Sequence, residues 1–171
     1  MKPFWLFLIT VLLFSPCLHG QESPKHHLFL EALGASGYGS VNYEYEGITL
    51  GADSNSLWHL SLNAGLGTYH FLDYERRFNP DIIVPLGINV SWGSRHRLKG
   101  GVGVIPSLIV TATPDGKQRS LITSFNLRLG YQYRTVTAKG KGLSLGLYYT
   151  PLFEYYHYIR HWGGLQIGFL F

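Results

Sequence analysis

The chain has 171 residues and a formal net charge of +4, with 21 glycines, 12 tyrosines and 10 phenylalanines but only 14% charged residues. A water-soluble domain usually carries about 25% charged residues, so we expect much of this surface to face something other than water. The basic residues are scattered along the sequence, which excludes an obvious nucleic-acid site.

The first 20 residues are typical of a secretory signal peptide. A positive charge precedes the apolar run Phe4–Phe14, and a more polar stretch follows at 15–20. The run is too short to span a bilayer as a helix. We therefore expect a signal peptide over 1–20 and one domain over 21–171. Cys17, the only cysteine, sits in a weak lipoprotein motif and would be removed with the signal, which excludes disulfides and thiol catalysis.

Apolar and polar side chains then alternate with a period of two, which predicts strands that have two different faces. We expect eight strands, at about 27–36, 40–47, 57–69, 82–92, 97–112, 120–134, 142–153 and 163–171. Strands of roughly ten residues can cross the hydrocarbon layer when tilted.

One boundary stays open at this stage. The phase of the alternation flips at 37–39, which fits a tight turn between two strands or a glycine bulge inside one long strand.

The connections between the expected strands fall into two groups. An even number of strands places both termini on one side, which in bacterial outer-membrane barrels is the periplasmic side. The outer connections would then be 37–39, 70–81, 113–119 and 154–162, and the inner ones 47–56, 93–96 and 135–141.

Alternation alone does not say which face is outside, because a soluble lipocalin-like barrel has the same period with its apolar face inward. Three features favour a membrane barrel: charges of both signs on the polar face, a chain that stops on an aromatic residue, and aromatic residues at strand ends, as in interface girdles. These aromatic residues are Trp58, Tyr69, Trp92, Tyr131, Tyr133, Tyr149 and Trp162.

The last strand carries Leu165, Ile167, Phe169 and Phe171 on every second position. An exposed apolar strand of this kind would promote aggregation of a soluble protein. The pattern resembles the C-terminal signal by which outer-membrane barrels are recognised for insertion. That resemblance implies contact with the barrel-assembly machinery.

The whole mature chain resembles the small eight-stranded outer-membrane barrels of the OmpX and OmpA-transmembrane group, and still more closely uncharacterised barrels of similar length. The resemblance rests on 40–44 (SVNYE), 129–133 (LGYQY), 149–153 (YTPLF) and the final Gly-Gly-Leu run. It implies an all-β, antiparallel, up-and-down transmembrane β-barrel in the cell outer membrane, monomeric and surrounded by lipid and lipopolysaccharide. It implies a fold and a place rather than an activity.

The polar face predicts a network inside the barrel, because eight strands leave an interior that side chains just fill. Its expected members are Glu31, Asn42, Glu44, Asn63, Lys99, Asn126, Arg128 and Gln132, with Glu46, Asn89 and Arg134 on the same face. We favour a plug of ion pairs and hydrogen bonds over a gated ion path or a catalytic carboxylate.

The histidines offer a metal site as an alternative. His26 and His27 lie near the N-terminus of the mature chain. His157 and His161 lie among tyrosines in the last outer connection. An i, i+4 spacing brings two histidines together on a helix, which a short barrel loop rarely forms. We favour an aromatic interface loop and expect no metal and no cofactor.

A lipid A-modifying or lipid-hydrolysing enzyme is the main alternative function. Such barrels place Ser, His and an acidic residue near the outer rim. The only rim candidates are Ser120 and Ser124, His70 or His157, and Glu75 or Glu154, and no motif of those enzymes is matched in order and spacing.

We therefore expect an integral outer-membrane protein with a structural or surface-interaction role and no catalytic residues. The outer segment 70–81 mixes aromatic residues with charges of both signs, so it is either a partner-binding loop or a solvated connection against lipopolysaccharide. A narrow pore is a further alternative, which the small number of strands makes less favourable.

Overall fold

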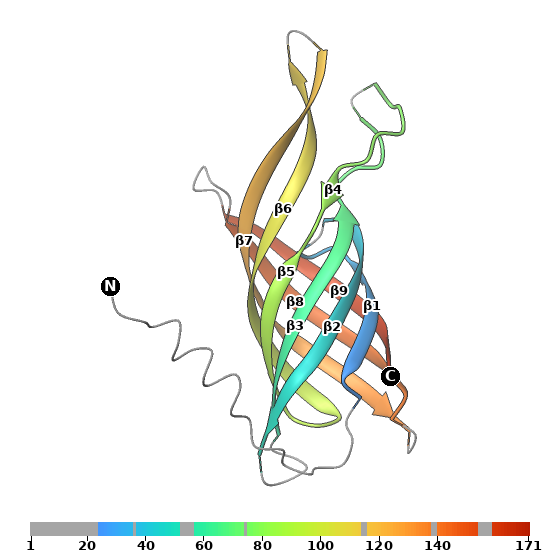
Figure 1. Cartoon of the computed structure of the whole chain (residues 1–171), viewed down its shortest axis with the longest axis vertical. Coiled ribbons are helices and arrows are strands. Elements are labelled where there is room, and N and C mark those ends of the chain that lie inside the picture. Colours follow the sequence, from blue (N-terminus) through green and yellow to red (C-terminus); the bar gives the residue numbers. More distant parts are fainter. Residues whose placement is uncertain are drawn as a thin grey trace, which may run out of the picture.

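The computed structural model describes residues 24–35, 37–51, 57–73, 75–113, 116–137, 140–153 and 159–171. The expected signal peptide lies outside this part of the chain. The described residues form a closed antiparallel β-barrel and no helix (Figure 1). None of their segments is therefore a helix that is long and apolar enough to cross a membrane.

Nine strand segments build the eight strands of the barrel. They are β1 (His26–Ala32), β2 (Gly39–Leu50), β3 (Trp58–Thr68), β4 (Ile82–Ile83), β5 (Leu86–Trp92), β6 (His96–Thr113), β7 (Gly116–Val136), β8 (Gly142–Phe153) and β9 (Ile159–Leu170). The segments β4 and β5 both lie between β3 and β6 and form one barrel strand. The interruption falls at Val84 and Pro85, since proline has no N–H to donate to a ladder.

The barrel closes between its first and last strands. β1 pairs with β9 from His27↔Leu170 to Ala32↔Leu165. Beyond this ladder the backbone N–H of Phe171 donates to the His26 carbonyl at 2.9 Å, and the N–H of His26 donates to the Phe171 carbonyl at 3.1 Å. Closure leaves no free edge around the wall. The start of β1 at His26 and the last residue, Phe171, lie at the same end of the barrel, which we call the terminus end.

The alternation in the sequence becomes two faces of the wall. In β2, for example, the burial alternates residue by residue from Ser40 to Gly47, with the polar side chains buried. The exposed outer face is formed by apolar side chains from every barrel strand, among them Leu28, Leu30, Val41, Leu62, Leu66, Ile88, Val90, Leu98, Val102, Leu127, Leu129, Leu145, Leu147, Leu165, Ile167 and Phe169. Soluble monomers rarely expose apolar patches larger than a few hundred Å². The apolar face is thus the outer one, the reverse of a lipocalin.

The region of the open boundary is a hairpin, so the alternative of one bulged strand is wrong. β1 ends at Ala32 and pairs with β2 from His26↔Tyr45 to Ala32↔Gly39. Leu33, Gly34 and Gly37 have φ values of 57°, 114° and 81°, which reverse the chain within a few residues. A bulge does occur, but in β2, between Glu46 and Ile48.

The expected outer loop at 113–119 is also wrong. β6 and β7 stay paired from His96↔Tyr133 to Thr113↔Gly116, and their far part projects beyond the other strands (Figure 1). The polar residues at 117–119 break the apolar alternation, and this break favours a loop when the sequence is read alone. In a hairpin that leaves the wall both faces meet solvent, so polar residues there are compatible with strand. Smaller shifts extend β2 to Leu50 and begin β9 at Ile159.

Candidate functional site

The interior of the barrel contains two clusters of buried side chains, one toward each end of its axis, with an ion pair between them. Toward the terminus end lies a charged cluster, which we define as His27, Glu44, Glu46, His59, Arg97, Lys99 and Arg134. At the opposite end lies a mouth cluster, which we define as Ala35, Ile83, Ile105 and Leu152 with the partly buried Tyr69 and Trp162. Between them, Glu31 pairs with Arg128.

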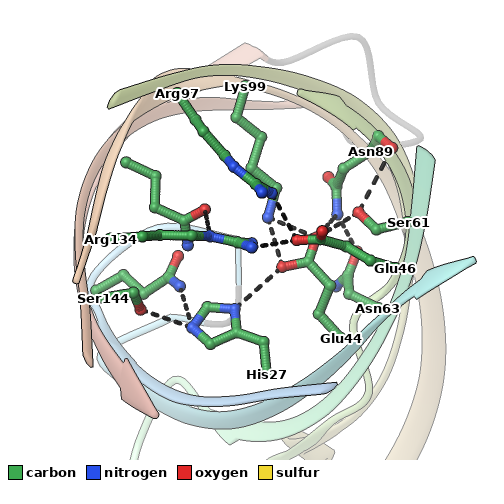
Figure 2. A network of polar contacts seen from close by, with 12 residues as sticks. His27, Glu44, Glu46, Ser61, Asn63, Asn89, Arg97, Lys99, Arg134 and Ser144 are labelled. Carbon is green, nitrogen blue, oxygen red and sulfur yellow. Dashed lines mark hydrogen bonds and ion pairs between the residues drawn. The ribbon is translucent and has the colours of Figure 1, made fainter. Parts of the chain in front are cut away.

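Glu44 is the centre of the charged cluster (Figure 2). Its carboxylate lies 2.5 Å from the ammonium nitrogen of Lys99 and accepts a hydrogen bond from the Ser61 hydroxyl, also at 2.5 Å. The side-chain amide of Asn89 donates to it at 3.1 Å. The second oxygen lies 3.2 Å from Nδ1 of His27. Side chains from β1, β3, β5 and β6 thus converge on one acid of β2, which explains how this carboxylate stays fully buried.

Glu46, two residues along β2, binds two guanidinium groups. Arg97 Nη1 donates to its carboxylate at 2.7 Å, and Arg134 forms an ion pair with the same oxygen. Nδ1 of His59 lies 3.4 Å from the other oxygen. Arg134 also donates from Nε to the Gln132 side-chain oxygen at 2.8 Å. Arg97 of β6 and Arg134 of β7 therefore form ion pairs with β2 across the interior of the barrel.

Glu31 and Arg128 form a separate ion pair nearer the mouth. Arg128 Nη2 donates to Glu31 at 2.5 Å, while the other Glu31 oxygen accepts a bond from the backbone N–H of Ala35 at 3.2 Å. The Arg128 guanidinium also lies 5.1 Å from the centre of the buried Tyr148 ring, within the range of a cation–π contact. One acid thus links the barrel wall to the β1–β2 turn.

That turn closes the mouth. Because Leu33, Gly34 and Gly37 reverse the chain, Ala35 is directed inward and is 1% exposed. It belongs to the mouth cluster, where Tyr69 and Trp162 rings lie 6.4 Å apart. The sequence predicts these two aromatic residues in an interface girdle; the structure packs them against the mouth cluster instead. The β1–β2 connection therefore contributes to the interior of the barrel.

The inward side chains leave little room for water, since every member of the charged cluster is at most 6% exposed. One interior cavity, of about 10 Å³, lies beside Asn63, Asn126 and Arg128, and it has roughly the volume that one water molecule requires. The charged cluster, the Glu31–Arg128 pair and the mouth cluster thus occupy the interior along the described part of the barrel.

All eight residues expected in the lumen are buried on the inner face: Glu31, Asn42, Glu44, Asn63, Lys99, Asn126, Arg128 and Gln132. Asn42 donates to Ser40 at 2.7 Å, and Asn63 accepts a bond from Asn89 at 3.0 Å. Among the members of the charged cluster, the sequence analysis did not assign His27, His59 and Arg97 to the lumen, and it considered His27 only as a possible metal ligand. Their positions in the alternation, in phase with Glu31, Ser61 and Lys99, could have revealed them.

Three further histidines, His26, His96 and His161, lie on the outer face next to tyrosines. Nδ1 of His26 lies 2.6 Å from the Tyr43 hydroxyl, and Nδ1 of His161 lies 2.5 Å from the Tyr149 hydroxyl. His96 and Tyr131 form a third such pair. Within the described residues no group of three or more His, Cys, Asp or Glu side chains could hold a metal ion. His157 lies outside the described part of the chain.

The rim residues proposed for an enzyme have separate partners. His70 Nδ1 lies 3.1 Å from Asp81, and the Ser120 hydroxyl lies 3.4 Å from that of Thr111. Ser124 is buried on the inner face, and Glu75 pairs with Arg77 at 3.5 Å. Glu154 lies outside the described residues. The described rim residues therefore do not assemble into a nucleophile–base pair with each other.

The four apolar residues of the expected insertion signal, Leu165, Ile167, Phe169 and Phe171, all point outward and are exposed. The Phe171 ring also stacks on His26 across the β1–β9 seam, with ring centres 5.6 Å apart.

Comparison with known proteins identifies the fold but not a family. No protein-family model matches the chain, and no curated protein matches it. The chain is similar to the crystal structure of the N-terminal β-barrel domain of Pseudomonas aeruginosa OprF, with a TM-score of 0.50 and 17% identity over 88% of this chain and 100% of that one. The chain therefore has the fold of the small eight-stranded outer-membrane barrels to which OprF and OmpA belong.

Proposed function

We propose that this protein is an integral outer-membrane protein whose barrel is closed to solutes and which acts as a structural or contact element of the membrane. The observation that carries the proposal is the combination of an apolar outer face with a filled interior. The first is stable only against hydrocarbon, and the second blocks a path through the barrel.

The proposal places both termini in the periplasm. The described N-terminal strand and Phe171 meet at one end of the barrel, together with the short turn at 93–95. The longer features, the β6–β7 hairpin and the segment 69–81, project from the other end (Figure 1). Bacterial outer-membrane barrels have short periplasmic turns and longer external loops, which supports this orientation.

In this role the partners are lipid, lipopolysaccharide at the external end and, during insertion, the barrel-assembly machinery. The outward residues Leu165, Ile167, Phe169 and Phe171 would be available for that recognition before the barrel closes. We propose a monomer, because the β1–β9 seam completes the barrel within one chain.

Three measurements test the proposal. The protein should be recovered in the outer-membrane fraction, and it should migrate differently on gels before and after boiling, as a detergent-resistant barrel does. Purified protein in planar bilayers should give no stable conductance above that of the lipid. Recovery as a folded protein in detergent-free buffer would contradict the membrane assignment, and a regular single-channel current would contradict the closed lumen.

A further inference from the structure

The outer face of the barrel contains a groove of about 1020 Å³, which crosses β5, β6, β7 and β8. Its floor includes the backbone at Gly100, and its walls include Trp58, Trp92, Leu129 and Leu147. Binding pockets for small ligands have volumes of roughly 300–1,000 Å³, so this groove can hold a large apolar molecule.

Gly100 creates the depression. It lies on the outward phase of β6 between Leu98 and Val102, and its neighbours on the adjacent strands are Val90 and Leu129. All four of these neighbours carry apolar side chains directed outward.

The chain itself does not require a glycine there. A Cβ at Gly100 would find only the Arg128 carbonyl oxygen, at 3.9 Å, and the residue has no positive φ. The inward Gly101 and Gly103 are different, because a Cβ there would overlap the side-chain oxygens of Asn89 and Asn126. Glycine inside a strand weakens it, and it often marks a close approach by a ligand. The glycine at position 100 therefore leaves open space on the outer face of the wall, where a ligand could approach the backbone.

The surroundings indicate what fills that space. One end of the groove is bordered by Trp58 and Trp92, whose rings lie 6.4 Å apart next to the terminus-end turns. Aromatic rings of this kind mark the headgroup level of a membrane. The turn beside Trp92 holds Arg95, an exposed cation. An apolar trough that ends in aromatic rings and a cation matches an acyl chain below an anionic headgroup.

We propose that the groove is a binding site for one anionic diacyl phospholipid, with an acyl chain over Gly100 and the phosphate group near Arg95. The inference rests on the proposed membrane location, since the groove would otherwise face water. In the proposed orientation it opens to the periplasmic leaflet.

The test uses the full mature chain in phosphatidylcholine vesicles, with Trp162→Phe so that the remaining fluorophores are Trp58 and Trp92, which both line the groove. Bromine-labelled phosphatidylglycerol, added as a minor component, quenches these tryptophans on contact. Because several apolar contacts and one ion pair favour the site, we expect a binding constant about threefold above that for random mixing.

Two glycine variants separate the site from ordinary boundary lipid. Gly100→Leu should reduce the quenching to the random level. Gly163→Leu is the matched control, because Gly163 is also exposed and open to a side chain, with the nearest atom at 3.8 Å, but does not line the groove. This control should quench like the parent. Equal quenching in all three proteins at the random level would overturn the inference.

The headgroup and the source of the lipid are tested separately. Arg95→Gln should remove the preference for phosphatidylglycerol over bromine-labelled phosphatidylcholine, and a preference unchanged by this variant would overturn the headgroup position. Relief of quenching by unlabelled lipopolysaccharide but not by unlabelled phosphatidylglycerol would overturn the phospholipid assignment. If the parent chain fails to fold into vesicles, the proposed function itself has failed; random quenching of a folded barrel refutes only the groove.

Discussion

The two ends of the barrel interior are closed by different physical means. Toward the termini, buried acids and bases bind each other across the lumen, with Glu44 and Glu46 as the two centres. At the mouth, apolar side chains around Ile105 and Leu152 pack as they would in the core of a soluble protein. The comparison teaches that an inward position need not be polar. Where the β1–β2 turn covers the lumen, water is excluded and the inner face becomes apolar.

The two regions should also respond differently to substitution. Removing one partner from a buried ion pair leaves an uncompensated charge, whereas truncating an apolar side chain leaves a cavity whose cost depends on local collapse. The substitutions below use this difference, from the largest expected effect to the smallest.

Glu44→Ala should have the largest effect. It leaves the buried Lys99 ammonium without its acid and removes the acceptor of Ser61 and Asn89. We expect a loss of about 3–5 kcal/mol in the free energy of unfolding. Guanidinium unfolding in lipid vesicles measures it. Glu75→Ala, in the exposed segment, is the control and should change stability by less than about 0.5 kcal/mol. Equal effects of the two substitutions would refute the central role of Glu44.

Ile105→Ala tests the mouth. The side chain is 0% exposed, so we expect a loss of about 2–4 kcal/mol in the free energy of unfolding. Leu121→Ala on the projecting hairpin, where the side chain is 69% exposed, should have little effect. The Ile105 variant should still show no conductance in planar bilayers, because the charged cluster closes the lumen on its own. A stable current through this variant would mean that the mouth cluster is the only seal.

Arg97→Ala should have a smaller effect than Glu44→Ala, because Glu46 keeps its ion pair with Arg134. The lost hydrogen bonds to a charged group predict a decrease of about 1.5–3 kcal/mol in the free energy of unfolding. The double variant Arg97→Ala/Arg134→Ala should lose more than the sum of the two single variants, since it leaves Glu46 without a guanidinium partner. A strictly additive double variant would contradict shared binding of one carboxylate.

Ser61→Ala should have the smallest effect of the series. It removes one hydrogen bond to Glu44, while Lys99 and Asn89 remain in place. We expect a loss of about 1 kcal/mol in the free energy of unfolding, measured in the same unfolding experiment. A loss as large as that of Glu44→Ala would show that the hydroxyl, rather than the ammonium, keeps the carboxylate buried.

Much of the fold can be predicted from the sequence because the alternation is a property of each strand. Leu127, Leu129 and Tyr131 point outward, and Asn126, Arg128 and Gln132 inward, whatever the neighbouring strands do. The limits of strands depend instead on what surrounds them. Nothing in the residues 117–120 alone distinguishes a loop from a hairpin that meets solvent on both faces.

The candidate site was predictable in membership but not in its pairing. The alternation along each strand places Glu31, Glu44 and Lys99 on the inner face. Which of these side chains form ion pairs with one another depends instead on the stagger of the strands around the barrel. Glu44 and Lys99 are separated by 55 residues, and Glu31 and Arg128 by 97. The alternation places Ile105 and Leu152 on the inner face, in phase with Lys99 and Thr150. It does not predict that they meet Ala35, which reaches the mouth cluster through a turn with positive φ at Leu33 and Gly34.

The most direct test of the account is the environment of the outer face. Single cysteines that carry a spin label would replace Leu66, Leu129, Leu147 and Leu165 on four strands, with Leu121 on the projecting hairpin as the reference. In vesicles the four wall positions should collide with lipid-soluble oxygen and be shielded from a water-soluble nickel complex, whereas Leu121 should show the reverse. Free access of the nickel complex to the four wall positions would contradict an apolar face directed into hydrocarbon.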